Sequence, residues 1–213
     1  MRVLVACESS GVVRRAFEAR GHEAWSADLR PAEDGSRNHF QGDVRRILAD
    51  GWDLMIAHPP CTYLTSAAAW AFTDGPYHQK VQPGTLVGAA RRAAREEAFQ
   101  FVRQLYYAPI QKIAIENPIG ALSSMLRLPD QIVQPWYFGD DASKSTCLWL
   151  IGLPLLQHCA TDYVRPRMVN GKPRWSNQTD SGQNRLSPGV DRWVKRSQTY
   201  KGIAKAADQW GRV

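Results

Sequence analysis

Short apolar runs alternate with amphipathic segments along most of the chain. Apolar and β-branched runs, each long enough for one buried strand, predict strands at 2–7, 22–28, 52–57, 109–118 and 144–153. Apolar residues at helical spacing predict helices at 12–21, 44–49, 88–105 and 203–210. Strands that alternate with helices indicate an α/β fold, with a mostly parallel sheet and helices on both faces.

The pattern changes after residue 156, where the chain becomes polar, basic and loop-like. We expect three parts: a catalytic domain at 1–156, a short basic loop region at 157–195, and a C-terminal helix at 196–213 that returns to the catalytic domain. The basic region contains aromatic residues, which suits contact with a nucleic acid, although a partly disordered linker has a similar composition. A long loop at 63–87 is either a lid or a partly disordered surface loop. The arginines of the helix at 88–105 are expected on its solvated face; the alternative is contact with phosphate.

Composition and charge narrow the classes of partner. The 213 residues carry a formal charge of +7, which favours a polyanionic partner, nucleic acid first. No apolar run approaches the roughly 20 residues of a membrane span and no signal peptide is apparent, so we expect a soluble, cytoplasmic protein, most simply a monomer. The four cysteines have neither CxxC nor metal-ligand spacing, which predicts reduced thiols and no metal site.

A cysteine follows two prolines at the end of the strand at 52–57. Pro59 and Pro60 end strand pairing and fix the direction of the chain, so the Cys61 side chain leaves the sheet edge in a defined orientation. Ligands bind at the carboxyl ends of strands in open α/β sheets. Cys61 is therefore a candidate nucleophile; the alternative is a small apolar residue beneath a loop.

Polar residues also mark the two later strands. The strand at 109–118 ends in Glu116, Asn117 and Pro118, and a glutamate inside a cleft can be held protonated to donate to a ring nitrogen. Lys144 begins the last strand and is either a partner for an anionic or carbonyl group or a surface lysine. If the strands are neighbours, Cys61 and Glu116 form a two-part site.

The first two strands end in residues that suit a nucleotide-like ligand. Glu8-Ser9-Ser10-Gly11 leads into the first helix, whose N-terminus would face the ligand; Glu8 either contacts a cationic group or caps that helix. Asp28 follows this turn by roughly 20 residues, as suits a carboxylate that binds a ribose diol. Asp43 is expected at the rim of the same crevice, next to an adenine.

The order of these motifs resembles that of the DNA cytosine-5 methyltransferases, especially short phage- or prophage-type members without a separate target-recognition domain. Pro59-Pro60-Cys61 matches the family's Pro-Cys motif, and Glu116-Asn117-Pro118 is similar to its Glu-Asn-Val motif, with Pro in place of Val. The resemblance implies a Rossmann-like S-adenosylmethionine-dependent methyltransferase fold, S-adenosylmethionine as cofactor and DNA as partner. Catalytic roles are implied for Cys61, Glu116 and Lys144. Cofactor-binding roles are implied for Glu8, Ser9, Ser10, Gly11, Asp28, Asp43, Pro59, Arg196 and Ser197.

The family's reaction would then proceed through a covalent adduct. The Cys61 thiolate adds to C6 of a flipped cytosine while Glu116 protonates N3, and C5 then attacks the carbon on the cofactor's sulfonium. With no separate target-recognition domain, low sequence specificity is expected. Lys195-Arg196-Ser197 stands where the family has Gly-Asn-Ser. A cation at Arg196 would suit a carboxylated S-adenosylmethionine, so the transferred group is either methyl or carboxymethyl.

Three other interpretations stay open at this point. An amino-methyltransferase would act on an exocyclic nitrogen and would need no thiol, which disfavours it here. A nucleic-acid-binding protein without catalytic activity would explain why most glycines of the cofactor motif are missing at Cys7–Gly11. An enzyme that modifies free cytosine nucleotides would fit the small size of the chain.

Overall fold

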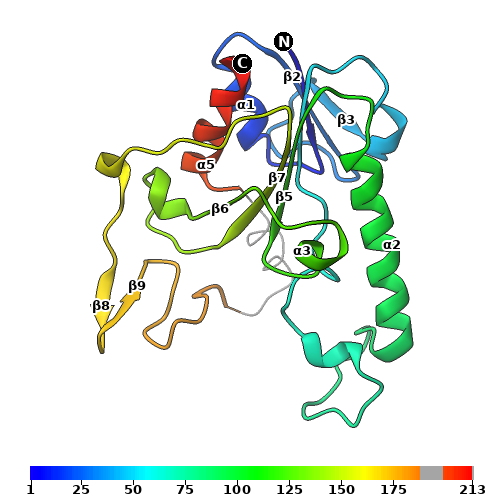
Figure 1. Ribbon diagram of the computed structural model, residues 1–213, viewed down its shortest axis with the longest axis vertical. Helices are drawn as coiled ribbons and strands as arrows, with labels where there is room; N and C mark the ends of the chain where they lie inside the picture. The colour runs from blue at the N-terminus through cyan, green and yellow to red at the C-terminus, as the bar shows by residue number, and fades with distance from the viewer. Residues whose placement is uncertain (188–198, 213) are drawn as a thin grey trace.

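The computed structural model describes residues 1–187 and 199–212 of the chain (Figure 1). Within these residues one sheet has the strand order β3-β2-β1-β4-β5-β7-β6. Its strands are β1 (Arg2–Ala6), β2 (Glu23–Asp28), β3 (His39–Gln41), β4 (Leu54–Ala57), β5 (Lys112–Pro118), β6 (Gln131–Val133) and β7 (Thr146–Ile151).

All of the pairings from β3 to β5 are parallel, whereas β7 runs antiparallel to both of its neighbours. A mostly parallel sheet whose next-to-last strand is reversed is the arrangement typical of methyltransferases. The predicted fold class, a Rossmann-like α/β fold of the methyltransferase type, is confirmed.

Helices cover both faces of the sheet, as expected (Figure 1). α1 (Val12–Glu18) and α5 (Lys201–Ala207) pack on one face, and α2 (Gly88–Tyr106) and α3 (Leu122–Met125) on the other. Strand residues alternate between the two cores because successive side chains of a strand point to opposite faces: Val3 and Val5 face α1 and α5, whereas Leu4 and Ala6 face α2.

Several short elements differ from the sequence prediction, which does not include β3, β6 or α3. The helix predicted at 44–49 is wrong, since only a 3₁₀ turn, η1 (Val44–Arg46), forms there. The Trp52 indole donates to the carbonyl of Ile47, which ends the turn and leads the chain into β4. The closing helix begins earlier than predicted, and after α5 it continues as the 3₁₀ helix η5 (Asp208–Arg212).

The loop at 63–87 is held against α2 by arginines. It contains the 3₁₀ helix η2 (Ala69–Phe72). Arg91 is only 6% exposed and donates to the carbonyls of Leu86 and Thr62, while Arg95 donates to that of Tyr63 and lies over the Phe72 ring. The prediction that these arginines lie on a solvated face is therefore wrong for Arg91, because the loop folds back over it. A lid function for the loop stays a prediction.

The region after residue 156 contains a 3₁₀ helix and a β-hairpin in place of a plain loop. η3 (Pro135–Phe138) lies between β6 and β7, η4 (Ala160–Asp162) follows β7, and β8 (Arg167–Val169) pairs with β9 (Lys172–Arg174) as a separate hairpin (Figure 1). The indoles of Trp136 and Trp175 stack 5.2 Å apart and join this region to η3. No helix among the described residues is both long enough and apolar enough to cross a membrane. The three-part division of the chain stays a prediction.

Candidate active site

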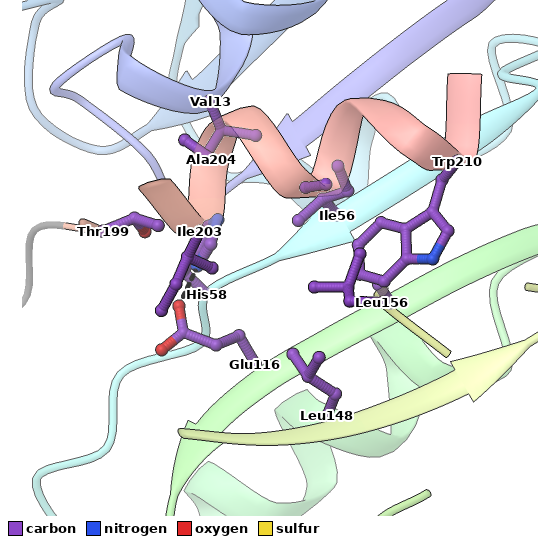
Figure 2. Close-up of a pocket in the computed structure, with 12 residues that line it drawn as sticks. Val13, Ile56, His58, Glu116, Leu148, Leu156, Thr199, Ile203, Ala204 and Trp210 are labelled. Atoms are coloured by element: carbon purple, nitrogen blue, oxygen red, sulfur yellow. Dashed lines mark hydrogen bonds and ion pairs between the residues drawn. The ribbon is translucent and has the colours of Figure 1, made fainter. Parts of the chain in front are cut away.

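The candidate site lies at the carboxyl ends of three adjacent strands, β1, β4 and β5. His58 directly follows β4, and its backbone N–H still donates to the carbonyl of Ala6 in β1. Its ring nitrogen Nδ1 lies 2.5 Å from Oε2 of Glu116, the fifth residue of β5 (Figure 2). Two residues 58 positions apart in the chain thus form a close hydrogen bond, and His58 was not among the predicted site residues.

Strand alternation explains why these two side chains meet. Ile56 of β4 and Ala114 of β5 both face the core beneath α1 and α5. His58 and Glu116 are each two residues further along, so they point to the same face. There they line a small pocket whose other lining residues are apolar apart from Thr199 and include Ile203 of α5 (Figure 2).

Opposite charges surround the Glu116 carboxylate. Burial alone would raise the pKa of Glu116, but the ammonium of Lys144, 4.0 Å away, and the His58 imidazole outweigh it and lower this pKa to about 2. Burial likewise would lower the pKa of His58, but Glu116 and, more weakly, Glu8 raise it. The expectation of a protonated Glu116 is therefore wrong for this geometry: the pair favours an imidazolium beside a carboxylate.

The segment that carries Cys61 is tied to the residues that follow Glu116. The side-chain amide of Asn117 donates to the carbonyl of Pro59 at 2.9 Å. Further along both segments, Thr65 and Gly120 form an antiparallel bridge. Cys61 is partly exposed and begins a tight turn, because its carbonyl accepts the amides of Leu64 and Thr65.

Glu8 caps α1, which is one of the two roles considered for it; contact with a cationic group stays a prediction. Its Oε1 accepts the backbone N–H of Val13 at 2.7 Å, and Oε2 accepts that of Arg14 at 3.3 Å. Ser10 donates to the same carboxylate, and Ser9 donates to Glu33. The prediction that amides of the first helix face a ligand is therefore wrong, since Glu8 occupies them.

Gly11 is required by the backbone at the start of α1. Its φ of +66° lies in the left-handed region, and a Cβ there would come within 2.6 Å of the side chains of Arg14 and Asp34. Steric constraints alone therefore explain why glycine occupies position 11, and contact of Gly11 with a cofactor stays a prediction.

A second, open cleft adjoins the His58 side chain. It holds about 350 Å³ of empty space, which includes solvent at its mouth. Its lining residues come from the ends of β1, β2 and β4 and from the start of α5: Cys7, Glu8, Ser9, Ser10, Arg30, Glu33, His58 and Thr199. Of the predicted cofactor residues, Glu8, Ser9 and Ser10 thus border one cleft.

Asp28 and Asp43 lie close to this cleft without lining it. Asp28 accepts the backbone N–H of Arg30 at 2.9 Å, and Asp43 caps η1 and pairs with Arg45. Burial, followed by the charges of Asp28 and Asp43, raises the pKa of Cys7 to about 12. The two carboxylates therefore share the neighbourhood of Cys7, at the end of β1.

Two predicted residues, Arg196 and Ser197, lie outside the described residues. In the part of the chain that the structure does describe, no group of three His, Cys, Asp or Glu side chains is arranged to hold a metal ion.

Comparison with known proteins adds little to this geometry. No protein-family model matches the sequence, and no curated protein is significantly similar to it. Among solved structures, the chain is similar to an Escherichia coli protein described as a "putative DNA modification methyltransferase encoded within prophage", with a TM-score of 0.44 and 14% sequence identity. The match covers 70% of this chain and 46% of that protein, so this chain spans less than half of its length.

Proposed function

We propose that this protein transfers a methyl group from S-adenosylmethionine, or a carboxymethyl group from its carboxylated form, to C5 of cytosine in DNA, through a covalent bond between Cys61 and C6. The observation that carries the proposal is the hydrogen bond from Asn117 to the Pro59 carbonyl, which ties the segment of a candidate nucleophile to the strand of a buried carboxylate. A thiol and a proton-carrying pair at neighbouring strand ends suit addition to an electron-poor ring.

The residues of the open cleft are compatible with S-adenosylmethionine. Glu8 and Glu33 line it and would complement a sulfonium or an ammonium group. The Arg30 side chain borders the same cleft and would suit a carboxylate, while Asp28 at the end of β2 suits a ribose diol. Glu8, Arg30, Glu33 and Asp28 are therefore the residues proposed to hold the cofactor. When bound, the cofactor supplies an electrophilic carbon on a sulfonium.

The protein's own groups would then do the following work. Cys61, as thiolate, forms a bond to C6 of the base, and the electrons of the C5–C6 double bond shift toward N3. N3 takes a proton from the pair of His58 and Glu116, which leaves C5 electron-rich and able to form its new bond to carbon. Loss of the C5 proton to water then expels the Cys61 thiolate, and return of the N3 proton to the pair of His58 and Glu116 restores the neutral aromatic ring.

DNA is the proposed substrate because of charge. The formal charge of +7 favours a polyanion, and a base in duplex DNA must leave the stack before a thiol can reach C6. The proposal includes low sequence specificity. Several arginines after residue 157 are already engaged within the protein: Arg167 pairs with Asp180, and Arg185 donates to the carbonyl of Gln178.

The test is incubation with DNA and cofactor, followed by mass spectrometry of the nucleosides. We expect 5-methylcytosine, with loss of the product in Cys61→Ala and retention in Cys159→Ala, since Cys159 is an exposed thiol on another part of the chain. A modified exocyclic nitrogen that persists in Cys61→Ala would instead identify an amino-methyltransferase.

Parallel reactions define the substrate and the transferred group. Single-stranded DNA, duplex DNA with varied flanking bases and free cytosine nucleotides are compared as substrates, and a carboxylated cofactor is supplied in a separate arm. A product with carboxymethyl at C5 would assign the alternative donor. Modification confined to one long target sequence would contradict low specificity. Absence of any cofactor binding by calorimetry would favour a binding protein without catalytic activity.

A further inference from the structure

The strand order places His58 between two carboxylates. β4 lies between β1 and β5 in the sheet, so the residue that follows β4 has the end of β1 on one side and β5 on the other. Glu8 follows β1 and acts electrostatically on the His58 ring, while Glu116 of β5 is hydrogen-bonded to it. His58 also lines both the open cleft and the pocket of Glu116, so it forms part of the wall between them.

The groups that face this imidazole can be named element by element. Glu116 comes from β5, Lys144 from the segment before β7, and Glu8 from the turn after β1; Thr199, before α5, is uncharged. The Nε2 atom of His58 is buried and has no hydrogen-bond partner among the described residues. The His58 ring thus faces two carboxylates, Glu8 and Glu116, and one ammonium, that of Lys144. The excess of negative charge favours the protonated form of the ring.

We propose that His58 is a positioning residue that stores, in its pair with Glu116, the proton that N3 of the base takes up. The proposal rests on the function proposed above and adds a residue to it. An ionised carboxylate beside Lys144 has no proton to give by itself, so the carboxylate needs a neighbour that carries one. His58 is the titratable group in hydrogen-bond contact with it.

The charges balance through the step. Before the reaction, imidazolium and carboxylate sum to zero, and the thiolate carries −1. As the bond between the Cys61 sulfur and C6 forms, one proton passes from the pair to N3, which leaves a neutral imidazole, a carboxylate and an uncharged base adduct. When the thiolate is expelled, the proton on N3 returns to the pair, and the starting charges are restored.

The decisive variant is His58→Asn, in which the amide can still donate to Glu116 near the position of Nδ1 but carries no titratable proton. The rate of 5-methylcytosine formation is measured in single turnovers between pH 5.5 and pH 9. In the wild type we expect the rate to fall as pH rises through the pKa of His58. In His58→Asn we expect a rate about 10²–10⁴-fold lower at neutral pH, which rises toward acidic pH because Glu116 must then take its proton from solution.

A second measurement does not depend on activity. The ring of His58 is titrated by NMR in the wild type and in Glu116→Gln, where we expect its pKa to fall because the neighbouring charge is gone.

His22→Asn is the matched control for the rate measurement. The His22 ring packs on Phe17 beside the start of β2, at the opposite end of the strands from the site. This variant is expected to keep both the wild-type rate and the wild-type pH profile.

The outcomes separate the two proposals. A His58→Asn rate that is lower by the same factor at every pH would indicate a structural role and overturn the inference, as would a His58 pKa that is equal in the wild type and in Glu116→Gln. Either result leaves cytosine modification by Cys61 intact. Wild-type protein that binds DNA and cofactor yet forms no C5 product would overturn the proposed function and this inference with it.

Discussion

Replacement of Gly120 by alanine should separate the two segments that carry the site. Gly120 lies two residues after β5 and bridges Thr65 in the turn that begins at Cys61. Its φ is not in the left-handed region, so the demand for glycine comes from space alone. A Cβ would lie 2.1 Å from the carbonyl oxygen of Leu64 and 2.8 Å from the Cα of Thr65, and both of these are backbone atoms that cannot rotate away.

The size of the effect follows from these contacts. An ordinary contact of 3.4 Å requires the two backbones to move apart by about 1.3 Å. That shift weakens the hydrogen bonds from Ala121 N–H to Leu64 and from Ser66 N–H to Ile119, each worth about 0.5–1.5 kcal/mol. With about 1–3 kcal/mol for overpacking, we expect the free energy of unfolding to fall by about 2–6 kcal/mol.

The assay combines urea unfolding with single-turnover rates on DNA. Because a displacement of about 1 Å between reacting groups costs on the order of 100-fold, the rate should fall by that factor at temperatures where Gly120→Ala is still folded. Gly21→Ala is the control: nothing lies within 4 Å of its Cβ, so it should lose about 1–2 kcal/mol through its positive φ and keep the wild-type rate. Wild-type unfolding and wild-type rate in Gly120→Ala would refute the reasoning.

Two further predictions concern the framework of the site. Burial alone would raise the pKa of Asp130, but Arg127 and the amide of Leu150 hold this pKa below its usual range. The contribution of Asp130 to stability is therefore complete above about pH 4 and is lost as pH falls through the lowered pKa. Urea unfolding should show wild type more stable than Asp130→Asn at pH 6, with a gap that closes in acid; a constant gap would contradict this. Arg91→Met should release the loop at 63–87 from α2, so chymotrypsin should cleave this loop faster than in the wild type. Arg103 is an exposed residue of the same helix, and in the control Arg103→Met the loop should be cleaved at the wild-type rate.

Five of the seven strands of the sheet, with the ends that carry the candidate motifs, could be predicted from local pattern, whereas the three-residue edge strands β3 and β6 could not. Apolar runs that stop at Pro59 or Pro118 locate the ends of buried strands within a few residues, since that signal depends only on neighbours in the chain. The 3₁₀ turn at 44–46 could not be told from a helix, because its end depends on a hydrogen bond from Trp52.

The role of His58 could not be predicted in this way. Its contact with Glu116 spans 58 positions and depends on β4 and β5 being neighbours, which no hydrophobic pattern specifies. One signal was present: His58 continues the alternation of Leu54 and Ile56 and stands just before the two prolines, so its side chain had to enter the same core face. The burial of Arg91 could not be predicted for a similar reason: the pattern of a helix does not show that a distant loop covers one of its polar positions.

The strand β5 reaches further along the sheet than β4 does. Its pairing with β4 ends at Ile115, but Glu116, Asn117 and Pro118 continue to pair with β7. Glu116 therefore belongs to a backbone ladder. Cys61 belongs to a turn that is held mainly by side chains: Asn117 donates to the carbonyl before it, and Arg91 and Arg95 donate to carbonyls within it. Local opening starts outside continuous backbone ladders, so the backbone amide of Glu116 should exchange its hydrogen as slowly as amides of the core, and the turn of Cys61 should be the part that adjusts when a base arrives.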